Sequence, residues 1–91
     1  KKLFGMFGGN TQEIKLRCSN KLLEQVTDRF GENIFITNVN EKTFDFTAKA
    51  AVSEGLVTWI MNYGDDIKVI KPDDLKQKII DRADKILKIY N

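Results

Sequence analysis

The stretch SEGLVTWIMNYGDDIKVIKP, residues 53–72, contains the only Trp, the only Pro and the densest apolar run of this 91-residue sequence. Ser53 is a good helix N-cap because its hydroxyl can accept a hydrogen bond from a free amide of the first turn. Gly64 readily adopts the left-handed conformation that ends many helices. Pro72 suits the first position of another helix, where its missing N–H has no effect. The stretch therefore predicts a helix over residues 53–64, a turn, a short strand over residues 67–70 and a last helix that begins at Pro72.

The predicted helix over residues 53–64 is apolar on more than one side. At 100° per residue, its apolar side chains spread over about 200° of the helix surface, roughly twice the width that packing on one sheet requires. These side chains are Leu56, Val57, Trp59, Ile60, Met61 and Tyr63. We therefore expect a sheet to cover one side of this helix and the last helix to cover the other, with Trp59 largely buried between them.

The rest of the sequence is also organised in short regular segments. Alternation of apolar and polar residues indicates a half-buried strand over residues 11–18, in which Ile14, Leu16 and Cys18 share the apolar face. Ser19 is expected to cap the helix that follows. In the last helix, apolar residues recur every three or four positions and are expected to pack against the helix over residues 53–64. The other predicted elements are a helix over residues 19–31, strands over residues 33–39 and 43–52, a hairpin loop at 40–42 and a helix over residues 72–90.

These elements follow the order β-α-β-β-α-β-α. Two β-α-β units with right-handed crossovers give the ferredoxin-like arrangement, an α+β sandwich in which a four-stranded antiparallel sheet carries two helices on one face. The expected strand order across the sheet is 4-1-3-2. The additional C-terminal helix is expected to form a third layer against the helix that carries Trp59.

Composition argues against several classes of function. The sequence has no His and a single Cys, so we expect no enzyme activity, no cofactor and no metal site. Its fifteen basic and thirteen acidic residues are interleaved, whereas a nucleic-acid binder usually concentrates its positive charge. No apolar run approaches the roughly 18 residues that cross a bilayer, so no membrane partner is expected. A lone Cys fits a reducing compartment and predicts a cytoplasmic protein.

Residues 1–10, KKLFGMFGGN, differ from the rest of the sequence. Three of the six Gly lie here beside large apolar residues, a mixture that is typical neither of a helix nor of a flexible linker. We interpret this segment as a connector from a missing upstream domain, and residues 11–91 as the ferredoxin-like domain; a tail tucked against its own domain is the alternative. Phe35 and Val39 are expected on the sheet face away from the helices. The candidate interdomain or dimer contacts are Leu3, Phe4, Met6, Phe7, Phe35 and Val39.

Three blocks of the sequence resemble one protein family. The runs FGMFGG, LRCSNKLLEQVTDRFG and GLVTWIMNYGDDIKVIKPDDL are similar, in order and spacing, to the C-terminal (WCX-type) extension of WYL-domain transcriptional regulators of the DeoR-like helix-turn-helix class. The matching positions are Leu16-Arg17, Arg29-Phe30-Gly31, Trp59, Gly64, Val69 and Pro72.

The resemblance implies a ferredoxin-like regulatory domain without catalytic activity. In this family a winged helix-turn-helix binds DNA, and a central WYL domain senses a ligand, for which nucleic acids or nucleotides are proposed. The extension contacts the WYL domain, takes part in dimer contacts and modulates the ligand response. The implied partners are therefore the upstream WYL and helix-turn-helix domains and a second copy, with DNA bound only through the missing N-terminal domain. Neither the DNA-reading helix nor the Trp-Tyr-Leu signature lies in this chain, so no site residue is carried over.

Other functions share the same fold. An ACT-type domain that senses a small ligand is an alternative that the sequence leaves open. A single-stranded nucleic-acid-binding module of the RNA-recognition type needs exposed aromatic residues on the two middle strands, and the outward positions of residues 11–18 and 43–52 are polar or charged. An acylphosphatase-type enzyme needs an anion-cradling loop after the first strand, and residues 18–20 contain no Gly.

Overall fold

The computed structural model describes residues 11–32 and 34–91. It confirms the predicted order of strands and α-helices and adds two short 3₁₀ turns, η1 and η2. In chain order the elements are β1 (Thr11–Ser19), η1 (Asn20–Leu22), α2 (Leu23–Phe30), β2 (Phe35–Thr37), β3 (Thr43–Ala51), α3 (Glu54–Met61), η2 (Gly64–Asp66), β4 (Ile67–Lys71) and α4 (Asp73–Tyr90).

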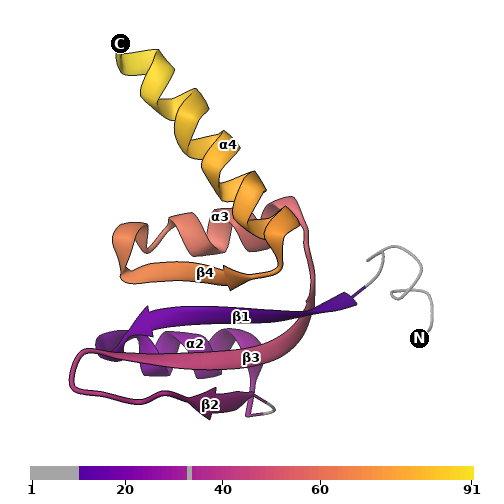
Figure 1. Cartoon of the computed structure of the whole chain (residues 1–91), viewed down its shortest axis with the longest axis vertical. Helices are drawn as coiled ribbons and strands as arrows, with labels where there is room; N and C mark the ends of the chain where they lie inside the picture. Colours follow the sequence, from indigo (N-terminus) through magenta and orange to yellow (C-terminus); the bar gives the residue numbers. More distant parts are fainter. Residues whose placement is uncertain (1–10, 33) are drawn as a thin grey trace.

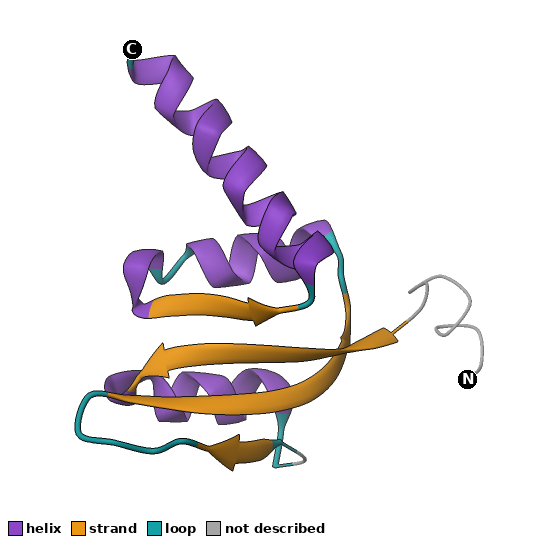
Figure 2. Cartoon of the chain, in the orientation of Figure 1, coloured by secondary structure: helices purple, strands orange, loops and turns teal. Residues whose placement is uncertain are grey.

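The four strands form one antiparallel sheet in the order β2-β3-β1-β4, as predicted. Figure 2 shows the long central strands β1 and β3 flanked by the shorter β2 and β4. Side chains of α2 and α3 join one core cluster with the inward residues of the sheet, so both helices pack on the same face. The fold is therefore the expected α+β, ferredoxin-like sandwich with an additional C-terminal helix.

Alternation along the two central strands builds the core. Ile14, Leu16 and Cys18 of β1 are fully buried. In the register with β3, Ile14 lies opposite Ala48 and Leu16 lies opposite Phe46. The helices complete this core with Val26 of α2 and with Leu56, Val57 and Ile60 of α3.

Ser53 bounds α3 as predicted, but the helix ends at Met61, with Asn62 as its C-cap, and Gly64 instead begins the 3₁₀ turn η2. The Ser53 hydroxyl accepts a hydrogen bond from the Leu56 amide at 3.2 Å, which makes Ser53 the N-cap. Gly64 has a φ of +58°, the left-handed conformation in which a side chain is strained. Pro72 is the N-cap of α4, one position before the helical residue that we predicted it to be.

Ser19 does not cap the first helix, contrary to the prediction. It is the last residue of β1, and its hydroxyl donates a hydrogen bond to Asp66 Oδ1 at 2.9 Å. The chain then passes through the 3₁₀ turn η1, so α2 begins only at Leu23. The Ser19 hydroxyl therefore bonds to Asp66, far along the chain, instead of capping the helix that follows Ser19.

Strand β2 is shorter than the predicted strand over residues 33–39. It spans three residues because Asn38 adopts a left-handed φ of +51°, which breaks the extended conformation. The Asn40 side-chain oxygen then accepts hydrogen bonds from the amides of Lys42 (2.8 Å) and Thr43 (3.0 Å). This Asx-type turn reverses the chain without the glycine that hairpin loops often use.

The last helix does not form the predicted third layer along its whole length. Leu75 is fully buried and Ile79 is partly buried, but the apolar residues that follow are exposed. Figure 1 shows α4 extending away from the rest of the domain towards the C-terminus. The reason is length, because the 18 residues of α4 span about 27 Å whereas α3, on which it packs, has only eight residues.

Trp59 is partly buried, and not largely buried as predicted. Its ring makes edge contacts with Phe30 of α2, at 5.4 Å between ring centroids, and with Tyr63, at 5.2 Å. Phe30 in turn packs against Phe46 of β3 at 5.1 Å. Phe30 and Tyr63 therefore cover Trp59, a role that we expected residues of α4 to have.

Candidate interaction surfaces

Helix α4 carries an exposed apolar stripe. At 100° per residue, its apolar side chains from Leu75 to Tyr90, apart from Ile89, fall within an arc of about 140°. Leu75 packs on the domain, whereas Ile80 is 51% exposed, Leu87 57% and Tyr90 83%. We define the α4 stripe as the exposed residues Ile80, Ala83, Ile86, Leu87 and Tyr90. An exposed apolar patch of several hundred Å² is the size that usually marks an interaction site.

The α4 stripe continues into a groove between α4 and β4, the strand at one end of the sheet. The groove has a volume of about 400 Å³, and Ile80 belongs to both the groove and the stripe. The groove is lined by Ile67 and Val69 of β4, by Ile79 and Ile80 of α4, and by Asp65, Lys68 and Lys76. The apolar side chains of β4 and α4 therefore form one continuous surface.

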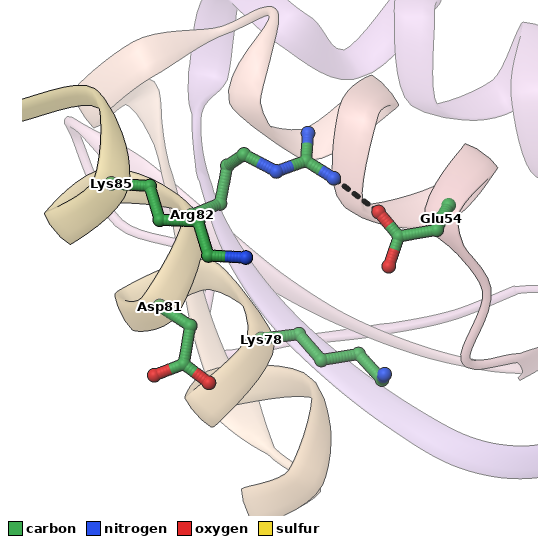
Figure 3. A pocket seen from close by; sticks show the side chains of 5 residues that line it. All are labelled: Glu54, Lys78, Asp81, Arg82 and Lys85. Carbon is green, nitrogen blue, oxygen red and sulfur yellow. Dashed lines mark hydrogen bonds and ion pairs between the residues drawn. The ribbon is translucent and has the colours of Figure 1, made fainter. Parts of the chain in front are cut away.

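A second hollow, of about 360 Å³, is polar and lies where α4 passes the start of α3. Figure 3 shows the Arg82 guanidinium in an ion pair with the Glu54 carboxylate. Lys78 and Lys85 extend to the same side of α4 as Arg82, whereas Asp81 points away. The ion pair neutralises Arg82 and ties α4 to the first turn of α3, whereas Lys78 and Lys85 add two further cations to the lining of the hollow.

Among the described residues, Asp45 is the only buried side chain that carries a charge. It lies opposite Arg17, whose Nε donates to Oδ1 at 2.8 Å and whose Nη2 donates to Oδ2 at 3.1 Å. Asn38 Nδ2 donates to the same Oδ2 at 2.9 Å. The hydrogen bonds from Arg17 hold the pKa of Asp45 below its usual value, although burial acts in the opposite direction.

Sequence reasoning placed Asp45 on the outer face of the sheet but missed this network. The available signal was the pair of opposite charges at Arg17 and Asp45, which face each other once the two central strands are aligned. The third member, Asn38, had no such signal because it reaches Asp45 from the left-handed turn that follows β2.

Phe35 and Val39 are both exposed, at 69% and 68%, but they lie on opposite faces of the sheet. Phe35 pairs with Thr47 on the outer face, whereas Val39 lies beside Ile36 at a hollow of about 310 Å³ on the helix side. The left-handed Asn38 reverses the alternation between them, so the prediction that they share one face is wrong. Their role as contact residues stays a prediction. The other predicted contacts, Leu3, Phe4, Met6 and Phe7, lie outside the described residues.

Reactive groups are sparse in the part of the chain that the structure describes. Its side chains include no cluster of three or more potential metal ligands. Cys18 is fully buried, and burial raises the pKa of its thiol to about 12, so the thiol is protonated and shielded at neutral pH. None of the described helices combines the length and the apolar character that a bilayer span requires.

The outer face of the sheet does not resemble a base-stacking platform. On β1 and β3, the outward side chains that the structure describes are polar or charged, apart from Ala51 at the end of β3, whereas single-stranded nucleic acid is held there by aromatic rings. The exposed ring of Phe35 lies on β2, at the edge of the sheet. This arrangement disfavours recognition of the RNA-recognition type.

Comparison with known protein families gives a direct match. The model of the WCX domain family matches residues 10–87, which is nearly the whole chain. The match confirms the resemblance that the sequence blocks indicated. A search among curated proteins finds no significant relative.

Proposed function

Because the chain belongs to the WCX domain family, we propose that it is the C-terminal regulatory domain of a bacterial WYL-type transcriptional regulator. In this proposal the domain is non-catalytic and cytoplasmic. It contacts the WYL domain and a second copy, and it thereby modulates the response to an effector. DNA is bound only by an upstream helix-turn-helix domain. The family match is the observation that carries this proposal.

The exposed apolar surface supports a role in protein contacts. The α4 stripe and the hollow beside Val39 each bring exposed large apolar side chains together, and contiguous apolar patches of this kind mark interaction sites. They lie towards opposite edges of the sheet, because the hollow is beside β2, the α4 stripe is beside β4, and β2 and β4 are the two edge strands. Two partners can therefore bind at the same time without overlapping.

The distribution of charge also supports a protein partner. Several cations on the described surface are paired with acids, as in Lys71 with Glu13 (3.0 Å) and Lys88 with Asp84 (3.1 Å), and the other cations are interleaved with acidic residues along the chain. A surface that contacts the DNA backbone instead concentrates positive charge that is free to meet phosphates. This pattern agrees with DNA binding through another part of the regulator.

We assign the contact with the WYL domain to the hollow beside Val39, which we name the Val39 hollow. Its lining is mostly apolar and belongs to the opposite end of the sheet from α4. The Val39 hollow is lined by Asn20, Leu23, Ile36, Val39 and Phe44. Val39 is among its exposed members, so a partner side chain can reach it directly.

The test measures binding between the whole chain and the separately purified product of the upstream part of its own reading frame. Isothermal titration calorimetry should detect a complex. Val39→Glu should weaken it at least about tenfold, because docking would bury an unpaired carboxylate. Ile89→Glu is the matched control, since it makes the same change at an exposed apolar residue on α4 and should alter the affinity by less than about twofold.

Two results contradict the proposed function. One is a reading frame whose upstream part encodes no WYL domain. The other is the lack of any complex between the two parts. A complex that Val39→Glu leaves intact would instead reject only the assignment of the Val39 hollow.

A further inference from the structure

The α4 stripe has the spacing of a helix–helix seam. Ile80, Ala83, Leu87 and Tyr90 follow one another at intervals of three, four and three residues, which keeps them on the side that faces a partner helix. The neighbouring side of α4, which includes Leu75, packs on the domain itself. The helix therefore has two adjacent apolar sides, one that meets its own domain and one that is exposed.

The two halves of α4 differ in charge. Residues 73–81 contain three Asp and two Lys, a net charge of −1, whereas residues 82–90 contain one Arg, two Lys and one Asp, a net charge of +2. An antiparallel pair of α4 helices places each half beside the half of opposite charge, and it also opposes the two helix dipoles. A parallel pair places like halves together. The charges of α4 are thus complementary to those of a second α4 helix when the two helices are antiparallel.

Side-chain size is complementary in the same orientation. With a two-fold axis near Lys85, Ala83 faces Leu87 of the second copy, and Ile80 faces Tyr90 of the second copy. A small residue opposite a large one lets the two helices approach closely. Because Ile80 also lines the groove beside β4, Tyr90 of the second copy reaches that groove.

We propose that two copies of this chain associate through an antiparallel pair of α4 helices, related by a two-fold axis near Lys85. This pairing rests on the proposed function, in which the domain contacts a second copy, and the α4 stripe is the surface of that contact. The stripe consists of five side chains of one helix, so we expect the pair to bury an area at or below the low end of specific interfaces, about 1,200 Å². The dimer is therefore expected to be weak and reversible.

Sedimentation equilibrium of the whole chain measures this association. Leu87→Glu should raise the dimer Kd at least about tenfold, because the seam would bury an unpaired carboxylate. Ile89→Glu is the matched control, since this residue is 75% exposed and lies outside the arc of the seam residues Ile80, Ala83, Leu87 and Tyr90; it should change the Kd by less than about twofold. Circular dichroism checks that both variants keep the fold.

The orientation is tested by oxidising cysteine variants. Ile80→Cys and Tyr90→Cys are examined separately and as an equal mixture. In the antiparallel pair the mixture forms a disulfide-linked dimer, whereas each variant alone does not, because its two cysteines lie about 15 Å apart along the helix axis. The native Cys18 is fully buried, so the unaltered chain gives the background.

Three results overturn the inference: a chain that stays monomeric at millimolar concentration, a dimer that Leu87→Glu leaves unchanged, or cross-linking of each cysteine variant alone, which indicates a parallel pair. The last two leave the proposed function intact if the chain still binds the upstream domains, whereas a monomeric chain also counts against its contact with a second copy. Conversely, an α4 dimer that binds no upstream domain contradicts the proposed function and supports the α4 pair.

Discussion

At the scale of single residues, Asp45 is the carboxylate whose ionisation bears most on stability. The hydrogen bonds from Arg17, and the one from Asn38, hold its folded-state pKa below the usual value, so folding favours the ionised form. This contribution to stability is present above the unfolded-state pKa of about 3.9, and it is lost as the pH falls through the folded-state pKa. We expect the free energy of unfolding to fall below about pH 4 and Asp45→Asn to remove that part of the pH dependence.

Urea denaturation across the acid range measures this effect. At neutral pH, Asp45→Asn should lower the free energy of unfolding by about 1–2 kcal/mol, because charge-assisted hydrogen bonds to a partly exposed Arg17 are lost. Asp28→Asn, at an exposed position of α2, is the matched control and should leave the profile unchanged. If Asp45→Asn gives a profile parallel to that of the native chain below pH 4, the network does not stabilise the fold as argued.

At the scale of elements, Ser53 decides where α3 begins. Its hydroxyl accepts a hydrogen bond from the Leu56 amide, a first-turn group with no acceptor inside the helix. Ser53→Ala should therefore lower the free energy of unfolding by about 1 kcal/mol. Ser53→Asp keeps an acceptor at the same position and should restore most of the loss. Equal stability of all three chains in urea would show that the cap contributes nothing.

The elements were predictable where their signals are local. The Ser53 cap, the left-handed conformation of Gly64 and the alternation along residues 11–18 depend on neighbours in sequence, and the structure contains all three. Ser19 has the same chemistry as Ser53, yet its hydroxyl bonds to Asp66, 47 residues away. No local pattern reports such an acceptor, so the start of α2 was misplaced.

At the scale of the whole molecule, a sequence pattern predicts which face of an element is apolar, but it does not predict what covers that face. The periodicity of α4 predicted an apolar stripe correctly, but it did not distinguish packing within the chain from exposure on a projecting helix. The same applies to Asp45, whose outer-face position follows from alternation while its burial depends on Arg17 and Asn38. The candidate contacts Phe35 and Val39 were rightly expected at the surface, but the turn at Asn38 separates their faces.

Deleting residues 85–91 tests how the projecting end of α4 contributes to the molecule. The deletion removes the exposed Leu87 and Tyr90 and keeps Leu75, which is buried, and Arg82, which pairs with α3. At low concentration, the shortened chain should melt within about 3 °C of the intact chain, because the lost side chains bury little surface within the domain. At high concentration, the intact chain should melt at a higher temperature, because a dimer formed only by folded chains stabilises them by mass action.

Scanning calorimetry at two protein concentrations about a hundredfold apart separates these effects. We expect the Tm of the intact chain to rise with concentration and that of the shortened chain to stay constant. A fall of more than about 10 °C on deletion at the low concentration would mean that the deleted end of α4 packs on its own domain. An equal rise in both chains would place self-association on a surface other than α4, because the shortened chain lacks half of the seam.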